Sequence, residues 1–440
     1  MLLRLGKVLG TTFLIAALAF GQQAQKQWKD RQEYDDFQAM AKEPDPAKKV
    51  ALIKAWRDKY PESQFKQEGL TLLTTAYAQQ GKFPELISTA QEILKIDPLD
   101  VTSLYWISSL APKLNNTSAD YLDAAEKASR ALAMEGDKVF ATERKPAGST
   151  PEQWTKAKSD MEVMALKSLA WIAMARKDND KAETAIQTFL DKNPNDGEAT
   201  YWMYTIIRAK KDPKRNSEAL YYLARAASMT ADKGGLPDAN RKQVDDFFVK
   251  AYNSYHGQDE AALKQLRATA LANPKPPPDF KIRTATEIAV EKENEFKSKN
   301  PQLAFWMGIK KELAGDNGQS FFEERVKGAA LPGKIEGTEF TTLKGRVISN
   351  NAKEVVLSMD DPEQPLGTEG EVTLKVEGGL RGKAEPGTEI EFEGIASNFT
   401  REPFMLTFDV EKDKLKGWTA TAPAPSKKAA PGRKSSGKKR

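Results

Sequence analysis

From about residue 26 to residue 275, hydrophobic side chains recur every three or four positions in short segments. This period places the apolar side chains on one face of an α-helix. Glycine, asparagine or proline interrupts the pattern between segments, so each segment predicts a separate helix. Since the same spacings return along this region, we expect a repeating helical array.

Two parts of this region share the same spacing. The distance from Leu70 to Pro98 equals the distance from Leu166 to Pro194, at 28 residues. In both, the first apolar residue of the second helix stands 12 residues before the proline. Small residues within these segments, such as Ala170, allow two helices to approach closely, and the proline ends the second helix. Each segment therefore predicts a helical hairpin.

These residues resemble the tetratricopeptide repeat, a helix–turn–helix unit of about 34 residues. The resemblance implies an α-solenoid in which the first helices of successive hairpins line a groove. Five or six units fit between residues 26 and 275, with insertions near residues 115–118 and 136–150. We expect a mainly α protein in which this domain precedes a smaller β domain.

The helical period also predicts which side chains face the groove. In the hairpin that begins near Val163, Leu166 and Ala170 lie on the face that packs against the neighbouring helix. Side chains one position further along, such as Lys167 and Trp171, therefore lie on a different face of the helix. The candidate groove residues are Tyr105, Lys167, Trp171, Met174, Tyr201, Thr205 and Arg208. Such a groove suits an extended peptide with acidic or aromatic groups. The alternative is that the aromatic side chains pack against the next repeat.

Beyond the proline run at 276–278, residues 276–335 predict a linker that contains further helices. From about residue 336 to residue 418 the hydrophobic period changes to two, which predicts strands. Five strands are expected, at 343–347, 355–359, 372–376, 390–394 and 404–410. They predict a small antiparallel barrel that resembles the oligonucleotide- and oligosaccharide-binding fold, with a β-sandwich as the alternative.

The charges of this β domain argue against nucleic acid as a partner. Glu389, Glu391 and Glu393 are expected on the outer face of one strand, where they would repel a phosphate backbone. Lys344 and Arg346 are expected to pair with these glutamates across the strands. A protein, a wall glycan or the helical domain itself fits this surface better.

The two termini have compositions of their own. Residues 1–21 combine basic residues with an uncharged run of about 14 residues, which is typical of a cleaved signal peptide and predicts a periplasmic or secreted protein. An uncleaved signal anchoring the chain in the inner membrane is the alternative. Residues 419–440 hold seven basic and no acidic residues, which predicts a disordered tail. That tail either contacts an anionic surface or only aids solubility.

The chemistry available to the chain is limited, because it has no cysteine and a single histidine, His256. Disulfides, thiolate nucleophiles and cysteine-based zinc sites are excluded. His256 lies between two expected helices, where a capping or turn hydrogen bond is the ordinary use. We therefore expect no catalytic site, no metal site and no cofactor. The sequence predicts a non-enzymatic scaffold that binds protein segments. A wall- or glycan-binding accessory protein and a non-catalytic subunit of an envelope enzyme complex remain alternatives.

Overall fold

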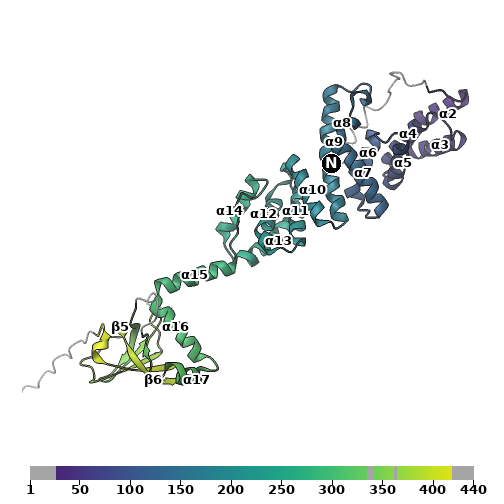
Figure 1. The fold of residues 1–440 in the computed structure, drawn as a ribbon. Helices are drawn as coiled ribbons and strands as arrows, with labels where there is room; N and C mark the ends of the chain where they lie inside the picture. The colour runs from purple at the N-terminus through teal and green to yellow at the C-terminus, as the bar shows by residue number, and fades with distance from the viewer. Residues whose placement is uncertain (1–25, 334–339, 361–363, 419–440) are drawn as a thin grey trace, which may run out of the picture. The chain divides into compact units, whose positions relative to one another are not determined.

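A computed structural model describes residues 26–333, 340–360 and 364–418 (Figure 1). The chain divides into two compact units, residues 1–285 and residues 286–440. The expected signal peptide and basic tail lie outside the described residues. Among the residues that are described, no helix is both long and apolar enough to cross a membrane.

The first unit is built from helices that follow one another in pairs, as the sequence predicts (Figure 1). The pairs are α2 (Arg31–Lys42) with α3 (Pro46–Lys59), α4 (Lys66–Gln80) with α5 (Phe83–Ile96), α6 (Val101–Leu114) with α7 (Ala119–Met134), α9 (Pro151–Ala175) with α10 (Asn179–Lys192), α11 (Gly197–Ala209) with α12 (Asn216–Ser228), and α13 (Asp238–His256) with α14 (Glu260–Ala272). The predicted tetratricopeptide-like array of helical hairpins is therefore confirmed.

Small residues form the contacts between these helices. Ala90, Ala170 and Ala182 are all fully buried, so the predicted close approach of the helices is confirmed. Aspartates begin many of the helices: the side chains of Asp100 and Asp196, for example, accept hydrogen bonds from the first turns of α6 and α11. Local sequence therefore sets where each helix begins, and the alanines set how closely neighbours pack.

The insertion expected at 136–150 packs back onto the array. It contains the short helices α8 (Gly136–Val139) and η1 (Thr142–Arg144). The indole of Trp154, in the first turn of α9, donates a hydrogen bond of 2.8 Å to the carbonyl of Phe140. Arg144 forms an ion pair of 2.8 Å with Asp97, at the end of α5. These contacts give the insertion a fixed place beside α9.

A buried arginine joins the last helices of the unit. Arg225 lies on α12 and is 2 % exposed. Its guanidinium donates to the carbonyls of Ala270 and Asn273 at the end of α14, at 2.7 and 3.2 Å. It also donates to the carbonyl of Pro194, beyond the end of α10, at 3.1 Å. Helix C-termini present unpaired carbonyls with partial negative charge. The Arg225 guanidinium therefore donates hydrogen bonds at the C-terminal ends of two helices, α10 and α14.

After α14 the chain continues without a helix or strand through residues 274–284, a segment called the strap below, which packs on α12. Ile282 of the strap is 7 % exposed, and its amide donates to the hydroxyl of Ser217 at 3.1 Å. The ring of Phe280 meets the ring of Tyr221 edge-on, with centroids 4.9 Å apart. His256 Nδ1 donates to the Arg283 carbonyl at 2.8 Å. The strap therefore completes the core of the first unit at its last helices.

Helix α15 (Ala285–Lys299) follows the strap and differs from the helices before it. It has no buried residue, and Val290 is 49 % exposed. Two ion pairs, Glu293 with Lys297 and Glu295 with Lys299, span one turn each at 2.7 Å. Local pairs of this kind support a helix without tertiary packing.

The second unit contains more than strands. Helix α16 (Pro301–Ala314), helix α17 (Gly318–Phe321) and the π-helical turn η4 (Phe322–Val326) precede the sheet. Trp306 and Leu313 of α16 are almost fully buried in one cluster with the inward side chains of the strands. The indole of Trp306 also donates to Glu371 at 3.0 Å. Residues expected to act as a linker thus contribute to the β-domain core.

The sheet of the second unit is curled, and it has eight strands among the described residues. They are β1 (Ala330–Leu331), β2 (Leu343–Asn350), β3 (Glu354–Ser358), β4 (Val372–Val376), β5 (Glu389–Phe392), β6 (Gly394–Thr400), β7 (Met405–Val410) and β8 (Leu415–Lys416). Their order is β1-β6-β7-β4-β3-β2-β5-β8. All pairs are antiparallel except β4 with β7, which is parallel and departs from the all-antiparallel expectation.

All five expected strands are present, and the fourth is longer than expected. It continues beyond Gly394 as β6, which runs to Thr400. Only Glu393 separates β5 from β6, although these strands lie near opposite ends of the sheet order. A side chain on Gly394 would come within 2.7 Å of Val410, so glycine is required at this bend. The bend lets one continuous strand serve both ends of the curled sheet.

Candidate functional site

The seven candidate groove residues lie on three first helices of the array: α6, α9 and α11. Tyr105 is half-buried on α6, and its ring contacts that of Trp106 with centroids 5.3 Å apart. Trp171 and Met174 are half-buried on α9, and each packs partly against a different hydrophobic cluster. These side chains therefore contribute to packing while part of their surface stays exposed.

Lys167 is the candidate that the structure most restricts. Its ammonium lies 2.8 Å from Asp196 and 2.9 Å from Glu198, both at the start of α11. Burial lowers the pKa of Lys167, but the two carboxylates outweigh it and the pKa is raised overall. The ammonium also lies 5.4 Å from the centre of the Trp202 ring. Lys167 thus joins α9 to α11, and its charge is already neutralised by its neighbours.

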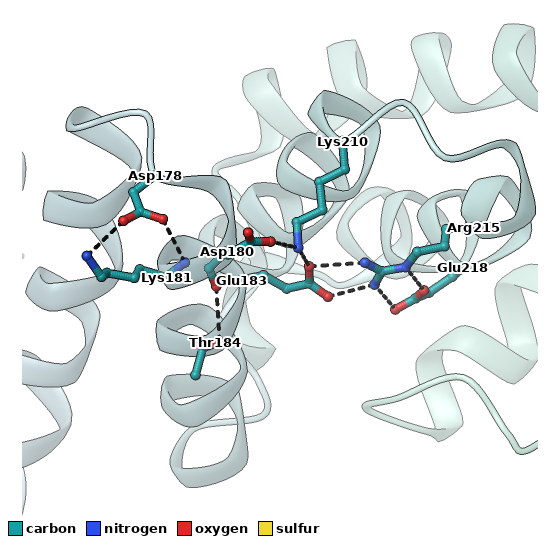
Figure 2. Close-up of polar contacts among 8 residues, drawn as sticks. All are labelled: Asp178, Asp180, Lys181, Glu183, Thr184, Lys210, Arg215 and Glu218. Atoms are coloured by element: carbon teal, nitrogen blue, oxygen red, sulfur yellow. Dashed lines mark hydrogen bonds and ion pairs between the residues drawn. The ribbon is translucent and has the colours of Figure 1, made fainter.

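A second set of cations near α11 is also neutralised (Figure 2). Lys210, just after α11, lies 2.6 Å from Asp180 and 2.5 Å from Glu183 of α10. Arg215 lies 2.7 Å from Glu183 and 2.7 Å from Glu218 of α12. Glu183 therefore accepts from two cations at once, and the network connects α10, α11 and α12.

This network makes part of the stability depend on pH. The Arg215 hydrogen bond, with Lys210, lowers the pKa of Glu183 from 4.5 to about 2. The folded state therefore binds this proton less tightly than the unfolded state, so the stabilisation is complete above pH 4.5 and is lost as the pH falls towards 2. We expect Glu183→Gln to lower the free energy of unfolding by about 2 kcal/mol at pH 7, somewhat below the full equivalent of the pKa shift because solvent screens the pair.

Urea unfolding at pH 7, 5.5, 4 and 3 measures this effect, and the difference between variant and parent should shrink below pH 4.5. Glu293→Gln is the matched control, because Glu293 forms its ion pair along α15, with Lys297, and is 62 % exposed. It should leave the free energy of unfolding almost unchanged, because solvent screens an exposed pair. A difference at Glu183 that is the same at every pH would contradict the role of its charge.

The remaining candidates, Tyr201, Thr205 and Arg208, share α11 with an aromatic row that the sequence analysis missed. The ring of Tyr201 lies 5.8 Å from that of Tyr204, which lies 6.0 Å from the ring of Phe247 on α13. Phe247 is 47 % exposed. The adjacent residues Phe247 and Phe248 could have indicated this exposed ring, because only one of two adjacent side chains on a helix can face the core.

Two cations border this aromatic row. Arg208 lies one turn after Tyr204 on α11, and Lys250 lies one turn after Phe247 on α13. Burial raises the pKa of Tyr204, and the neighbouring charge of Arg208 acts against this rise. Arg208 donates to the side-chain amide oxygen of Asn216. Within the described residues, neither Arg208 nor Lys250 has a carboxylate at ion-pair distance, which sets them apart from Lys167, Lys210 and Arg215.

The described part of the chain contains no group of three or more histidine, aspartate or glutamate side chains placed to hold a metal ion. On the β domain, Lys344 lies 3.0 Å from Glu389 and 3.9 Å from Glu391, as expected for cross-strand partners. Glu393 lies 3.3 Å from Lys414. Arg346 donates to the carbonyl of Gln364 at 2.9 Å.

No protein-family model matches the chain. No curated protein sequence matches it either. Among solved structures, the chain is similar to a tetratricopeptide repeat protein from Parabacteroides merdae, with 17 % sequence identity and a TM-score of 0.26. The similarity covers 55 % of this chain and 96 % of that protein.

Proposed function

We propose that the chain is a non-enzymatic scaffold that binds segments of other proteins along the first helices of its array. The observation that carries this proposal is the set of partly exposed aromatic side chains on α9, α11 and α13, held by an otherwise well-packed array. Aromatic side chains that keep exposed surface on a rigid support are favoured in protein interfaces, because little side-chain entropy is lost on binding.

The proposal includes export and a second contact. A cleaved signal at residues 1–21 would place the scaffold in the periplasm or outside the cell, and the basic tail would add a contact to an anionic surface. The β domain would hold a second partner. The five expected strands, in a curled sheet whose fourth strand bends between β5 and β6, support its similarity to the oligonucleotide- and oligosaccharide-binding barrel. Two binding domains on one chain would add avidity.

Crosslinking in intact cells tests the scaffold function. A photoreactive residue at Trp171 should capture one or a few defined proteins, since this side chain is partly exposed on α9. The control position is Met134, at the end of α7, which is 63 % exposed. The same protein captured at Trp171 and absent at Met134 would support the proposal. If Trp171 captures only the chain itself, the proposal is wrong.

A further inference from the structure

We infer that the partner segment is an extended chain in which aromatic and acidic residues alternate, and that it binds over the row of Tyr201, Tyr204 and Phe247 between Arg208 and Lys250. This inference rests on the proposed function and narrows it to one surface and one partner chemistry. The surface is named below as the α11–α13 surface and consists of these five residues.

The spacing of the rings indicates an extended partner. Consecutive ring centroids in the row are 5.8 and 6.0 Å apart. Alternate side chains of an extended chain lie about 6.6 Å apart on the same side, whereas one helical turn rises about 5.4 Å but rotates its side chains around a cylinder. An extended segment can therefore place every second side chain against successive rings. Contacts between aromatic rings at such distances are favourable.

The charges indicate what the other side chains of the partner are. Three nearby cations, Lys167, Lys210 and Arg215, already bind carboxylates of the same chain. Arg208 and Lys250 border the rings and, among the described residues, have no such carboxylate. A partner with acidic residues beside its aromatic ones would pair with them, and a basic partner would be repelled.

The placement of Phe247 supports binding over simple packing. Its neighbour Phe248 is fully buried in the core formed with α12 and α14, whereas Phe247 is 47 % exposed and its ring meets that of Tyr204 edge-on. A phenylalanine this exposed loses hydrophobic stabilisation in the free protein that a bound segment would restore. Since its rim is polar and charged, the α11–α13 surface has the composition of a small interface.

The test uses the purified chain and a fluorescein-labelled peptide of nine residues in which phenylalanine and glutamate alternate. Fluorescence polarisation should detect binding, and Phe247→Ala should weaken it about tenfold. Arg208→Gln should weaken it about fivefold and reduce its dependence on salt. Matched controls are Leu271→Ala on α14, where the parent residue is 45 % exposed, and Lys127→Gln on α7, and both should bind as the parent does.

Two further peptides complete the test. Replacement of glutamate by lysine, or of phenylalanine by serine, should abolish binding. Equal binding of the lysine peptide, unchanged binding by the Phe247 and Arg208 variants, or no binding of any peptide would overturn the inference. The Trp171 crosslink separates this failure from failure of the proposed function: a partner still captured in cells by the Phe247→Ala variant leaves the scaffold function standing and removes only the α11–α13 surface.

Discussion

Replacing Arg225 with methionine should lower the free energy of unfolding of the first unit by about 4 kcal/mol. Methionine keeps most of the buried volume, so packing changes little. What is lost is the donor for the carbonyls of Ala270, Leu271 and Pro194, all of which accept from the buried guanidinium. Buried acceptors without donors are costly, because water cannot replace the lost hydrogen bonds. Arg225→Lys should have a free energy of unfolding between those of the parent and of Arg225→Met, since an ammonium cannot reach all these carbonyls at once.

Hydrogen exchange and urea unfolding measure this effect. Exchange should rise first in α12 and α14, the helices that Arg225 joins. Arg130→Met provides the control, because Arg130 forms an ion pair with Glu126 along α7 and is 52 % exposed. The Arg130→Met variant should lower the free energy of unfolding by less than about 0.5 kcal/mol. If the two variants have equal stability, then Arg225 does not hold the end of the array together.

Replacing Ile282 with aspartate should also destabilise the first unit, by about 4 kcal/mol, because it places an unpaired charge where the strap meets α12. Ile282 is 7 % exposed, and its amide donates to Ser217 beneath it. The strap should then leave its site and expose Tyr221 and the aromatic side chains around it. The same reasoning predicts that a fragment ending at residue 275 is less stable than one ending at residue 299.

The control for this variant is Val290→Asp, only eight residues further on. Val290 is 49 % exposed on α15, so a charge there remains in water and should cost less than about 1 kcal/mol. Thermal unfolding followed by circular dichroism compares the two variants. A melting temperature for Ile282→Asp equal to that of Val290→Asp would mean that the strap adds nothing to the core.

The helical array could be predicted because its information is local. The spacing of apolar residues and the closing prolines depend on helix geometry alone, and the buried alanines follow from the same spacing. The β domain was harder to predict. A β-bulge between Ala396 and Asn398 shifts the alternation of inward and outward side chains. The alternating pattern that predicts a strand therefore breaks off within β6. The role of α16 was also missed, although Trp306 and Leu313 stand seven residues apart on one helix face.

The candidate site depends on contacts that no local pattern contains. Helical spacing placed Lys167 on the predicted groove face, but its partners Asp196 and Glu198 come from the next hairpin. Asp196 could be recognised as a helix-starting residue, since its side chain accepts from Ala199, yet that role says nothing about Lys167. Likewise, only the packing of α13 decides that Phe248 is buried and Phe247 is exposed.

The order of the strands has a consequence for how the chain folds during synthesis. In the first unit, each hairpin mainly contacts its neighbours in sequence, so helices can fold one pair at a time as they leave the ribosome. The sheet cannot form in this way, because β7 lies between β6 and β4 and is among the last strands made. Until Val410 has been synthesised, β4 lacks its parallel neighbour. The second unit should therefore fold later and more slowly than the first.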